Sequence, residues 1–403
     1  MTSRPGGDAP GRRDLLVPFG TRPEFVKLAP VVAALRGAGH RVRAVATGQH
    51  YDATMADAFF AELGLDPDER WELAGDEAER LGRLTTLAER ELASHRPDLV
   101  VLLGDTNTIP AFCLAARRAG VPLAHLEAGL RSFNETSIEE VNRKVAAVSA
   151  RLHLAPTEMA ASFLRLEGVP DERVAVVGNP VIDVLVRSGA PIVPPASRRG
   201  VLLTAHRATN VDDPERLGRL VELVGRLAKE VGPVTFPVHP RTARRLEEQG
   251  ELGRLDAEGV ELRPPVGYGE MLQLLSRATV AVTDSGGVQE EASYFGVPTV
   301  VLRSSTPRWE GVALGTSRLV GMDVEAALEA AAGFARAEEQ ARVAEVPCPY
   351  GDGRTSERVV GLLERPETWE LLAIREPDLV GFVPSFGDSP RAAPVGPVPG
   401  TGR

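Results

Sequence analysis

Three carboxylates in the first half of the chain have the types and positions expected of acid–base groups. Asp105, Glu127 and Glu139 each follow or lie near an apolar segment. Burial disfavours the charged form of a carboxyl group, so we expect the pKa values of these three side chains to be raised toward that of a general base. Structural roles are also open, because Asp105 could cap a helix and Glu139 could be an acid in a first helical turn.

Two histidines in the second half follow predicted strands, and one of them, His206, stands where a leaving group could be protonated or stabilised. His206 precedes Arg207, and His239 precedes Pro240. A titratable imidazole beside a cation suits a departing phosphate. Each histidine by itself could equally be structural.

Two glycine-containing segments are typical of anion binding. In the segment DSGGVQEE, residues 284–291, Gly286 and Gly287 would open a helix and let a phosphate approach the backbone N–H groups. Glu290 or Glu291 could then accept hydrogen bonds from ribose hydroxyls. The alternative is an ordinary capped helix start. The segment GTRPE, residues 20–24, similarly combines a tight turn, a cation and a proline suited to a first helical turn.

Alternating strand and helix patterns would position these clusters. We expect strands at Leu15–Phe19, Val42–Ala46, Leu99–Leu103, Pro122–His125, Val174–Val177, Gly200–Thr204, Val234–Pro237, Val260–Leu262, Val280–Thr283 and Thr299–Leu302. Helices are expected at Glu24–Arg36, Ala78–Ser94, Ile109–Ala119, Pro214–Glu230, Met271–Ser276 and Gln289–Phe295. This order predicts an α/β fold with parallel sheets covered by helices on both faces. The polar clusters follow the strands, at the edge where such sheets bind ligands, so we expect them to line one cleft.

The composition excludes several function classes. A formal net charge of −10 and a pI near 5.4 argue against a nucleic-acid surface or a basic membrane patch. Cys113 and Cys348 match no metal or redox spacing and fit a reducing cytoplasm. No apolar run is long enough to cross a bilayer, and P-loop, HExxH and GxGxxG motifs are absent. Among the 46 basic residues, Lys27 is one of few lysines, which gives it more weight than a single arginine.

The motifs occur together in one order that resembles a known family. They read PFGTRPEFVKLAPV, TGQH, GDTNT, AHLEAGLRS, EEVNR, APT, VGNPVID, AHR, VHP, TDSGGVQEE and TPRWEGVALGTSRLVG. In this combination the chain resembles the non-hydrolysing UDP-N-acetylglucosamine 2-epimerases from about residue 15 to residue 321, and through the following helical region to 372. The resemblance implies UDP-N-acetylglucosamine and UDP-N-acetylmannosamine as the substrate pair, no metal or nicotinamide cofactor, and a homodimer.

The resemblance also implies a fold like that of GT-B glycosyltransferases, with two Rossmann-like lobes and an active site in the cleft between them. The expected divisions are a disordered N-terminal arm at 1–13, an N-terminal α/β domain with the carboxylates at 14–186, a linker at 187–199, a UDP-binding C-terminal α/β domain at 200–353, a helical region that packs back on the first domain at 354–375, and a disordered Pro/Gly-rich tail at 376–403.

Site roles follow from the same resemblance. In such enzymes a carboxylate removes the C2 proton while UDP leaves C1 by anti elimination, giving 2-acetamidoglucal, to which UDP adds back. The matching catalytic residues are Asp105, Glu127, Glu139 and His206. The matching substrate-binding residues are Arg22, Lys27 and Arg143 near the phosphates and sugar; Ser285, Gly286 and Gly287 for the diphosphate; Glu291 for the ribose; and Arg308, His239 and the segment Tyr268–Met271 for phosphate and uracil.

Departures from the family pattern keep some alternatives open. The loop between residues 131 and 139 is shorter, with Ile138 in place of a proline, so the exact hexosamine is open. Asp52, Ala208 and Thr209 differ from the residues of the secondary site through which UDP-N-acetylglucosamine activates many bacterial members, so we do not expect this activation. The alternatives are a hydrolysing 2-epimerase, a GT-B glycosyltransferase and a silent nucleotide-sugar sensor. Pro23 after GTR favours the non-hydrolysing group.

Overall fold

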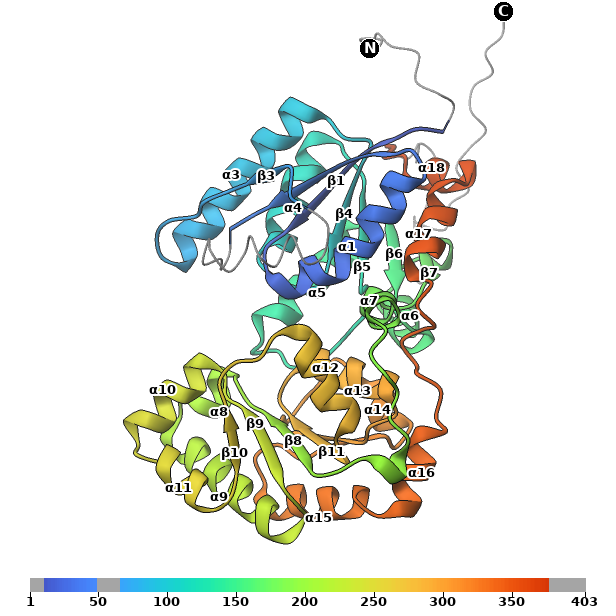
Figure 1. The fold of residues 1–403 in the computed structure, drawn as a ribbon. Coiled ribbons are helices and arrows are strands. Elements are labelled where there is room, and N and C mark those ends of the chain that lie inside the picture. Colours follow the sequence, from blue (N-terminus) through green and yellow to red (C-terminus); the bar gives the residue numbers. More distant parts are fainter. Residues whose placement is uncertain (1–10, 49–65, 377–403) are drawn as a thin grey trace, which may run out of the picture.

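The structure is a computed structural model that describes residues 11–48 and 66–376. The chain forms two lobes, one above the other in Figure 1, each built on a parallel sheet. This arrangement confirms the predicted α/β fold with two parallel sheets. Nearly all of the expected N-terminal arm (1–13) and C-terminal tail (376–403) lies outside the described residues.

The first lobe contains a seven-stranded sheet in the order β3-β2-β1-β4-β5-β6-β7. Its strands are β1 (Asp14–Phe19), β2 (Arg41–Ala46), β3 (Glu69–Arg70), β4 (Leu99–Leu103), β5 (Leu123–Leu126), β6 (Leu152–Ala155) and β7 (Val174–Val176). Its helices are α1 (Arg22–Gly37), α3 (Glu77–His95), α4 (Thr108–Ala119), α5 (Ile138–Ser149), α6 (Glu158–Leu166), the 3-10 turn η1 (Asp171–Arg173) and α7 (Pro180–Ser188).

Alternate side chains of the central strands enter two different cores. In β1, Leu15 and Val17 join a cluster with α1 and α7, whereas Leu16 joins a cluster with α3 and α4. A strand that is buried on both faces is expected in a parallel sheet covered by helices on each side. The two helical layers therefore hold β1 and β4 rigidly, and the loops that follow these strands start from fixed points.

The second lobe repeats the plan with a six-stranded sheet in the order β10-β9-β8-β11-β12-β13. Its strands are β8 (Val201–Thr204), β9 (Val234–Pro237), β10 (Glu261–Arg263), β11 (Val280–Thr283), β12 (Thr299–Val301) and β13 (Ser317–Leu319). The other elements are η2 (Pro195–Ser197), α8 (Ala208–Val211), α9 (Pro214–Glu230), α10 (Pro240–Glu248), α11 (Leu252–Ala257), α12 (Tyr268–Arg277), α13 (Gly286–Phe295), α14 (Trp309–Ala313), α15 (Val324–Phe334) and α16 (Ala337–Ala344).

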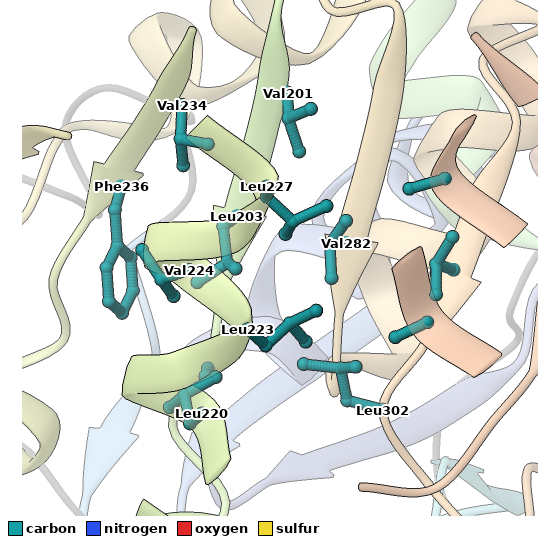
Figure 2. Close-up of a cluster of buried hydrophobic side chains, with 14 of the residues drawn as sticks. Val201, Leu203, Leu220, Leu223, Val224, Leu227, Val234, Phe236, Val282 and Leu302 are labelled. Carbon is teal, nitrogen blue, oxygen red and sulfur yellow. The ribbon is translucent and has the colours of Figure 1, made fainter. Parts of the chain in front are cut away.

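One core of this lobe lies between the sheet and the long helix α9. Figure 2 shows Leu220, Leu223, Val224 and Leu227 of α9 against Val201, Leu203 and Phe236 of the sheet. The helix starts sharply because the Asp213 side chain caps it, accepting hydrogen bonds from two backbone N–H groups, and because Pro214 occupies the first turn.

The chain returns to the first lobe at its C-terminal end. Helices α17 (Thr355–Leu363) and α18 (Pro366–Leu372) lie beside the first lobe in Figure 1, and Val359 and Leu363 join the core of β1 and α1. The buried carboxylate of Asp183 in α7 accepts hydrogen bonds from the backbone N–H groups of Thr355 at 2.9 Å and Ser356 at 2.7 Å. Since it satisfies orphan donors at the start of α17, Asp183 fixes the returning segment on α7.

The strand positions expected from the sequence are confirmed to within one residue at each end. The prediction was incomplete, because it omitted β3, β6 and β13. Helix α13 begins at Gly286 rather than Gln289, and α12 at Tyr268 rather than Met271, so the polar and glycine residues before the expected starts are helical.

Candidate active site

The carboxyl ends of central strands from both sheets meet at one cavity of about 490 Å³. The loops after β1 and β4 form one wall, and those after β8 and β11 contribute to the other. Each of these strand pairs stands where the strand order of its sheet reverses direction. Such reversal points open a crevice at the sheet edge, which is the usual ligand site of this architecture.

Thirteen of the fifteen site residues expected from the sequence line this cavity. They are Arg22, Lys27, Asp105, Glu127, Glu139, Arg143, Tyr268, Met271, Ser285, Gly286, Gly287, Glu291 and Arg308. His206 and His239 are not among the lining residues. Their rings lie together with centroids 5.5 Å apart, and Arg207, next in the chain to His206, does reach the cavity.

A buried set of charged and polar side chains joins the two lobes at the cavity wall. This interlobe ion network consists of Lys27, Glu127 and Asn179 from the first lobe and Glu290 and Arg308 from the second. The ammonium of Lys27 donates to Glu127 and, at 2.9 Å, to Glu290. The Asn179 amide donates to Glu127 at 2.8 Å and Glu290 at 3.0 Å. Arg308 donates to Glu290 at 2.9 Å. Two cations thus face two carboxylates.

The network sets the protonation of Glu127 against our expectation. Burial alone raises the pKa of this carboxyl, but the charges of Lys27 and Arg308 and the hydrogen bonds from Lys27 and Asn179 lower it to about 2. The expected rise of the Glu127 pKa is therefore wrong. Lys27 shows the converse effect: burial lowers the pKa of its ammonium, yet Glu127 and Glu290 hold it above the ordinary value. Both groups stay charged.

Glu127 also has an unusual backbone. Its φ of 60° lies in the left-handed region, which costs a non-glycine residue roughly 1–2 kcal/mol. Such strain persists only where surrounding contacts determine the conformation, and it is common at functional sites.

Asp105 is held at the cavity by a second buried arginine. Arg143 of α5 is almost fully buried, and its guanidinium bonds Asp105 on one side and Glu140 at 2.7 Å on the other. The Asp105 side chain is 30% exposed and lines the cavity. It does not cap the next helix, because α4 begins at Thr108 with Asn107 in the capping position. The helix-cap alternative for Asp105 is therefore wrong.

Glu139 lines the same cavity from the first turn of α5. Its carboxylate accepts a hydrogen bond from the hydroxyl of Ser137. Burial raises the pKa of Glu139, but the hydrogen bond from Ser137 and the charges of Arg207 and Arg143 bring it below the ordinary value. The expected rise is wrong here too, since neighbouring donors and cations outweigh burial.

The N-terminus of α13 forms the opposite wall. Ser285 caps the helix, accepting a hydrogen bond from the Val288 N–H at 3.5 Å, and Gly286 and Gly287 follow at the cavity surface. Arg308 packs directly over Gly286, where an added Cβ would lie 3.2 Å from its guanidinium. Backbone N–H groups, the helix dipole and a cation therefore converge, as an anion site requires.

Two other carboxyl groups that line the cavity, rather than Glu127 and Glu139, have raised pKa values. Burial raises the pKa of Glu291 to about 7. Burial also raises that of Glu24 to about 7, although Glu24 accepts hydrogen bonds at 2.8 Å from the Thr106 hydroxyl and the backbone of Gly20. The sequence interpretation missed Glu24. Its signal was the Thr-x-x-Glu capping box that the structure shows at the start of α1.

Two arginines add to the positive charge of the cavity. Arg207 and Arg303 both line it; Arg207 was considered only as the cation beside His206, and Arg303 was not expected as a site residue. The pKa of Arg303 falls to about 10 because of burial and the nearby cations Arg207 and Arg308. Asp284 fixes the loop that carries Arg207, accepting hydrogen bonds from the backbone N–H of Arg207 at 3.0 Å and of His206. Such crowding of cations favours a multiply charged anion.

Other expectations can be placed on the described residues. Ile138 is the first residue of α5 and is exposed. Ala208 and Thr209 begin α8 and are not among the residues that line the cavity, whereas Asp52 lies outside the described residues. Within residues 11–48 and 66–376, His, Cys, Asp and Glu side chains form no group of three that could ligate a metal, and no helix is long and apolar enough to span a membrane.

Two parallel sheets that face one cavity define a GT-B-like, two-lobed α/β protein. A family model described as UDP-N-acetylglucosamine 2-epimerase matches residues 33–364. The chain belongs to this family.

Two relatives each align with most of this chain. A UDP-N-acetylglucosamine 2-epimerase of Methanocaldococcus jannaschii is 35% identical over 87% of this chain and 98% of its own. A UDP-2,3-diacetamido-2,3-dideoxy-D-glucuronate 2-epimerase of Pseudomonas aeruginosa is 36% identical over 87% of this chain and 99% of its own. A crystal structure of the M. jannaschii UDP-GlcNAc 2-epimerase with UDP-GlcNAc and UDP has a TM-score of 0.77 and 34% identity, covering 87% of this chain and 99% of that chain.

Proposed function

We propose that the protein interconverts UDP-N-acetylglucosamine and UDP-N-acetylmannosamine by inverting C2. One observation carries this proposal: Asp105 and Glu139 of the first lobe line the same cavity as the anion-binding N-terminus of α13 in the second. An acid–base step on a sugar and the departure of its diphosphate require these two kinds of group on opposite sides of one substrate.

The second lobe holds the nucleotide. The N–H groups that follow Ser285, at Gly286 and Gly287, bind the diphosphate together with Arg308, and Arg22 and Lys27 approach it from the first lobe. Glu291 accepts hydrogen bonds from the ribose. Tyr268 and Met271 of α12, which line the cavity, form the uracil end, and His239, which does not line it, is assigned there by the family pattern alone. The positive charge of Arg207 and Arg303 beside α13 supports a diphosphate rather than a neutral ligand.

The first lobe performs the proton transfers. A carboxylate removes the proton on C2, the C1–O bond breaks with its electron pair on UDP, and 2-acetamidoglucal forms. A proton then returns to the opposite face of C2 while a UDP oxygen bonds to C1. We assign the two faces to Asp105 and Glu139, whose carboxylates reach the cavity. Glu127 stays ionised and orients Lys27. His206 assists the departure of the diphosphate, because it lies on the same loop as Arg207, which lines the cavity.

A second candidate differs only in the sugar. The P. aeruginosa relative is named for a diacetamido uronate and is as similar to this chain as the M. jannaschii protein. The same inversion at C2 would act on that substrate. A homodimer and a cytoplasmic location complete the proposal, which the family membership supports.

Conversion in D2O followed by NMR tests the proposal. Incubation with UDP-N-acetylglucosamine should give intact UDP-N-acetylmannosamine with deuterium at C2, because the proton exchanges with solvent during elimination. Release of free N-acetylmannosamine and UDP would instead identify a hydrolysing enzyme, and no reaction without an added acceptor would favour a transferase. Turnover of the diacetamido uronate alone would replace the first substrate by the second.

A further inference from the structure

A second cavity lies at the end of the first sheet opposite to the candidate active site. It has a volume of about 520 Å³ and lies between the C-terminal half of α5, the start of β6 and the turn η1 before β7. The cavity therefore lies at the amino end of β6, whereas the candidate active site lies at the carboxyl ends of the strands. We call this cavity the basic pocket, after the cations in its lining, which are Arg117, Lys144, Arg151 and Arg173.

The basic pocket is positively charged, whereas the chain as a whole is negatively charged. Its cations gather in a protein with a formal net charge of −10. The acidic side chain in its lining is Glu167, whose two carboxylate oxygens are already bonded to Arg131 at 2.7 Å and 2.6 Å. Arg117 and Lys144 form no ion pair with any described residue. The pocket therefore keeps an excess of positive charge.

One of the lining cations is held in place by the protein. Arg151 donates to the carbonyl of Leu371 at 2.7 Å and to that of Ala373 at 3.1 Å, which fixes its guanidinium plane. Burial lowers the pKa of Arg151, and the nearby charges of Arg173 and Arg117 lower it further. Cations that crowd in this way repel one another, and an anion between them would relieve the repulsion.

A buried histidine supplies an independent sign of a missing partner. His153 of β6 lines the pocket and is only 1% exposed, and its Nδ1 atom makes no well-formed hydrogen bond to any described residue, although the backbone of Ala150 lies near the ring. A buried polar atom without a partner is unfavourable and uncommon in folded proteins. A ligand oxygen in the pocket would provide that partner.

We propose that the basic pocket binds a small anion that carries two or more phosphate groups. Phosphate oxygens match the planar donors of Arg117, Arg151 and Arg173, and several charges on one ligand match several cations. The cavity volume falls within the range of small-molecule sites. The ligand is a metabolite rather than a nucleic acid, because the acidic chain would repel a long polyanion outside the pocket.

Calorimetric titration with inorganic pyrophosphate at low salt tests this site. Wild-type protein should bind two equivalents, one in the active site and one in the basic pocket. The double variant R117Q/K144Q changes two exposed side chains, so the fold should persist, and it should lose one equivalent or bind it at least tenfold more weakly. UDP affinity serves as the check that this variant keeps an intact active site.

The matched control is R118Q, which removes a neighbouring exposed arginine of α4 that is paired with Glu89 at 2.8 Å. It should keep both equivalents. Equal stoichiometry and affinity in the wild type, the double variant and the control would overturn the proposal, whether one equivalent or two were bound. The outcome does not depend on which sugar the active site converts.

Discussion

Replacement of Glu290 by glutamine should strongly destabilise the protein. The Glu290 side chain is completely buried and bonded to Lys27 at 2.9 Å and Arg308 at 2.9 Å. Glutamine keeps the shape of the side chain and removes its charge. Two buried cations would then face Glu127 alone.

The expected magnitude follows from the cost of an unpaired buried charge. Breaking a buried ion pair by removing one partner costs roughly 3–5 kcal/mol. A unit of 150–250 residues loses about 2–4 °C in Tm for each kcal/mol, so the expected decrease is roughly 6–20 °C. The decrease should persist at high salt, since buried charges are poorly screened.

Thermal unfolding followed by circular dichroism measures this effect. The control is E215Q, which breaks an exposed pair with Arg219 on α9 and should change Tm little. Adding K27M to E290Q restores the charge balance and should recover part of the lost Tm. The reasoning is refuted if E290Q melts together with E215Q, or if the double variant K27M/E290Q loses the sum of the two single effects.

Three further predictions concern the cavity. D105N should lower kcat by roughly 10²–10⁴-fold with UDP affinity little changed, measured by NMR turnover and calorimetry, because a proton-transfer group is lost. G286A should raise KM about tenfold, or about 1.4 kcal/mol, by displacing Arg308, whereas G287A should be milder, because an added Cβ would meet only the Ser285 hydroxyl at 3.9 Å. For Glu291, the folded-state pKa of about 7 exceeds the ordinary 4.5, so its contribution to stability is present below 4.5 and is lost as pH rises through 7. Urea unfolding at pH 5.5 and 8.5 should show this loss, and the loss should be smaller in E291Q, in which Glu24, whose pKa is also raised to about 7, still contributes.

The longer strands could be predicted from the sequence because their own residues carry the signal. LVVLL at β4 and VAVT at β11 are apolar and β-branched, as strands buried on both faces require. Strand β3 has only Glu69 and Arg70 and exists because it pairs with β2. Strand β6 includes the polar residue His153, and its pairing with β5 and β7 decides its conformation. Such strands depend on neighbours that a local pattern does not contain.

In the cavity, too, some features follow from the local sequence and others depend on residues that are distant in the chain. The residues that line it could be predicted because polar segments follow the strands, and the carboxyl ends of parallel strands share one edge. The protonation states of the lining carboxyl groups could not be predicted in this way. Lys27 and Glu127 are 100 positions apart in the sequence, and only folding brings the ammonium into contact with the carboxylate. Without that contact, burial of Glu127 indicates a raised pKa; with it, the pKa falls.

The interlobe ion network also constrains how the two halves of this protein can be recombined. A chimera that joins the first lobe of one relative to the second lobe of another inherits Lys27, Glu127 and Asn179 from one parent and Glu290 and Arg308 from the other. Suppose that one parent carries neutral residues at a matching pair of network positions, one in each lobe. Its hybrid with a parent that keeps the charged pair would contain a buried charge without its partner, although both parents fold well. Substitutions at these positions should therefore covary between the two halves of the chain.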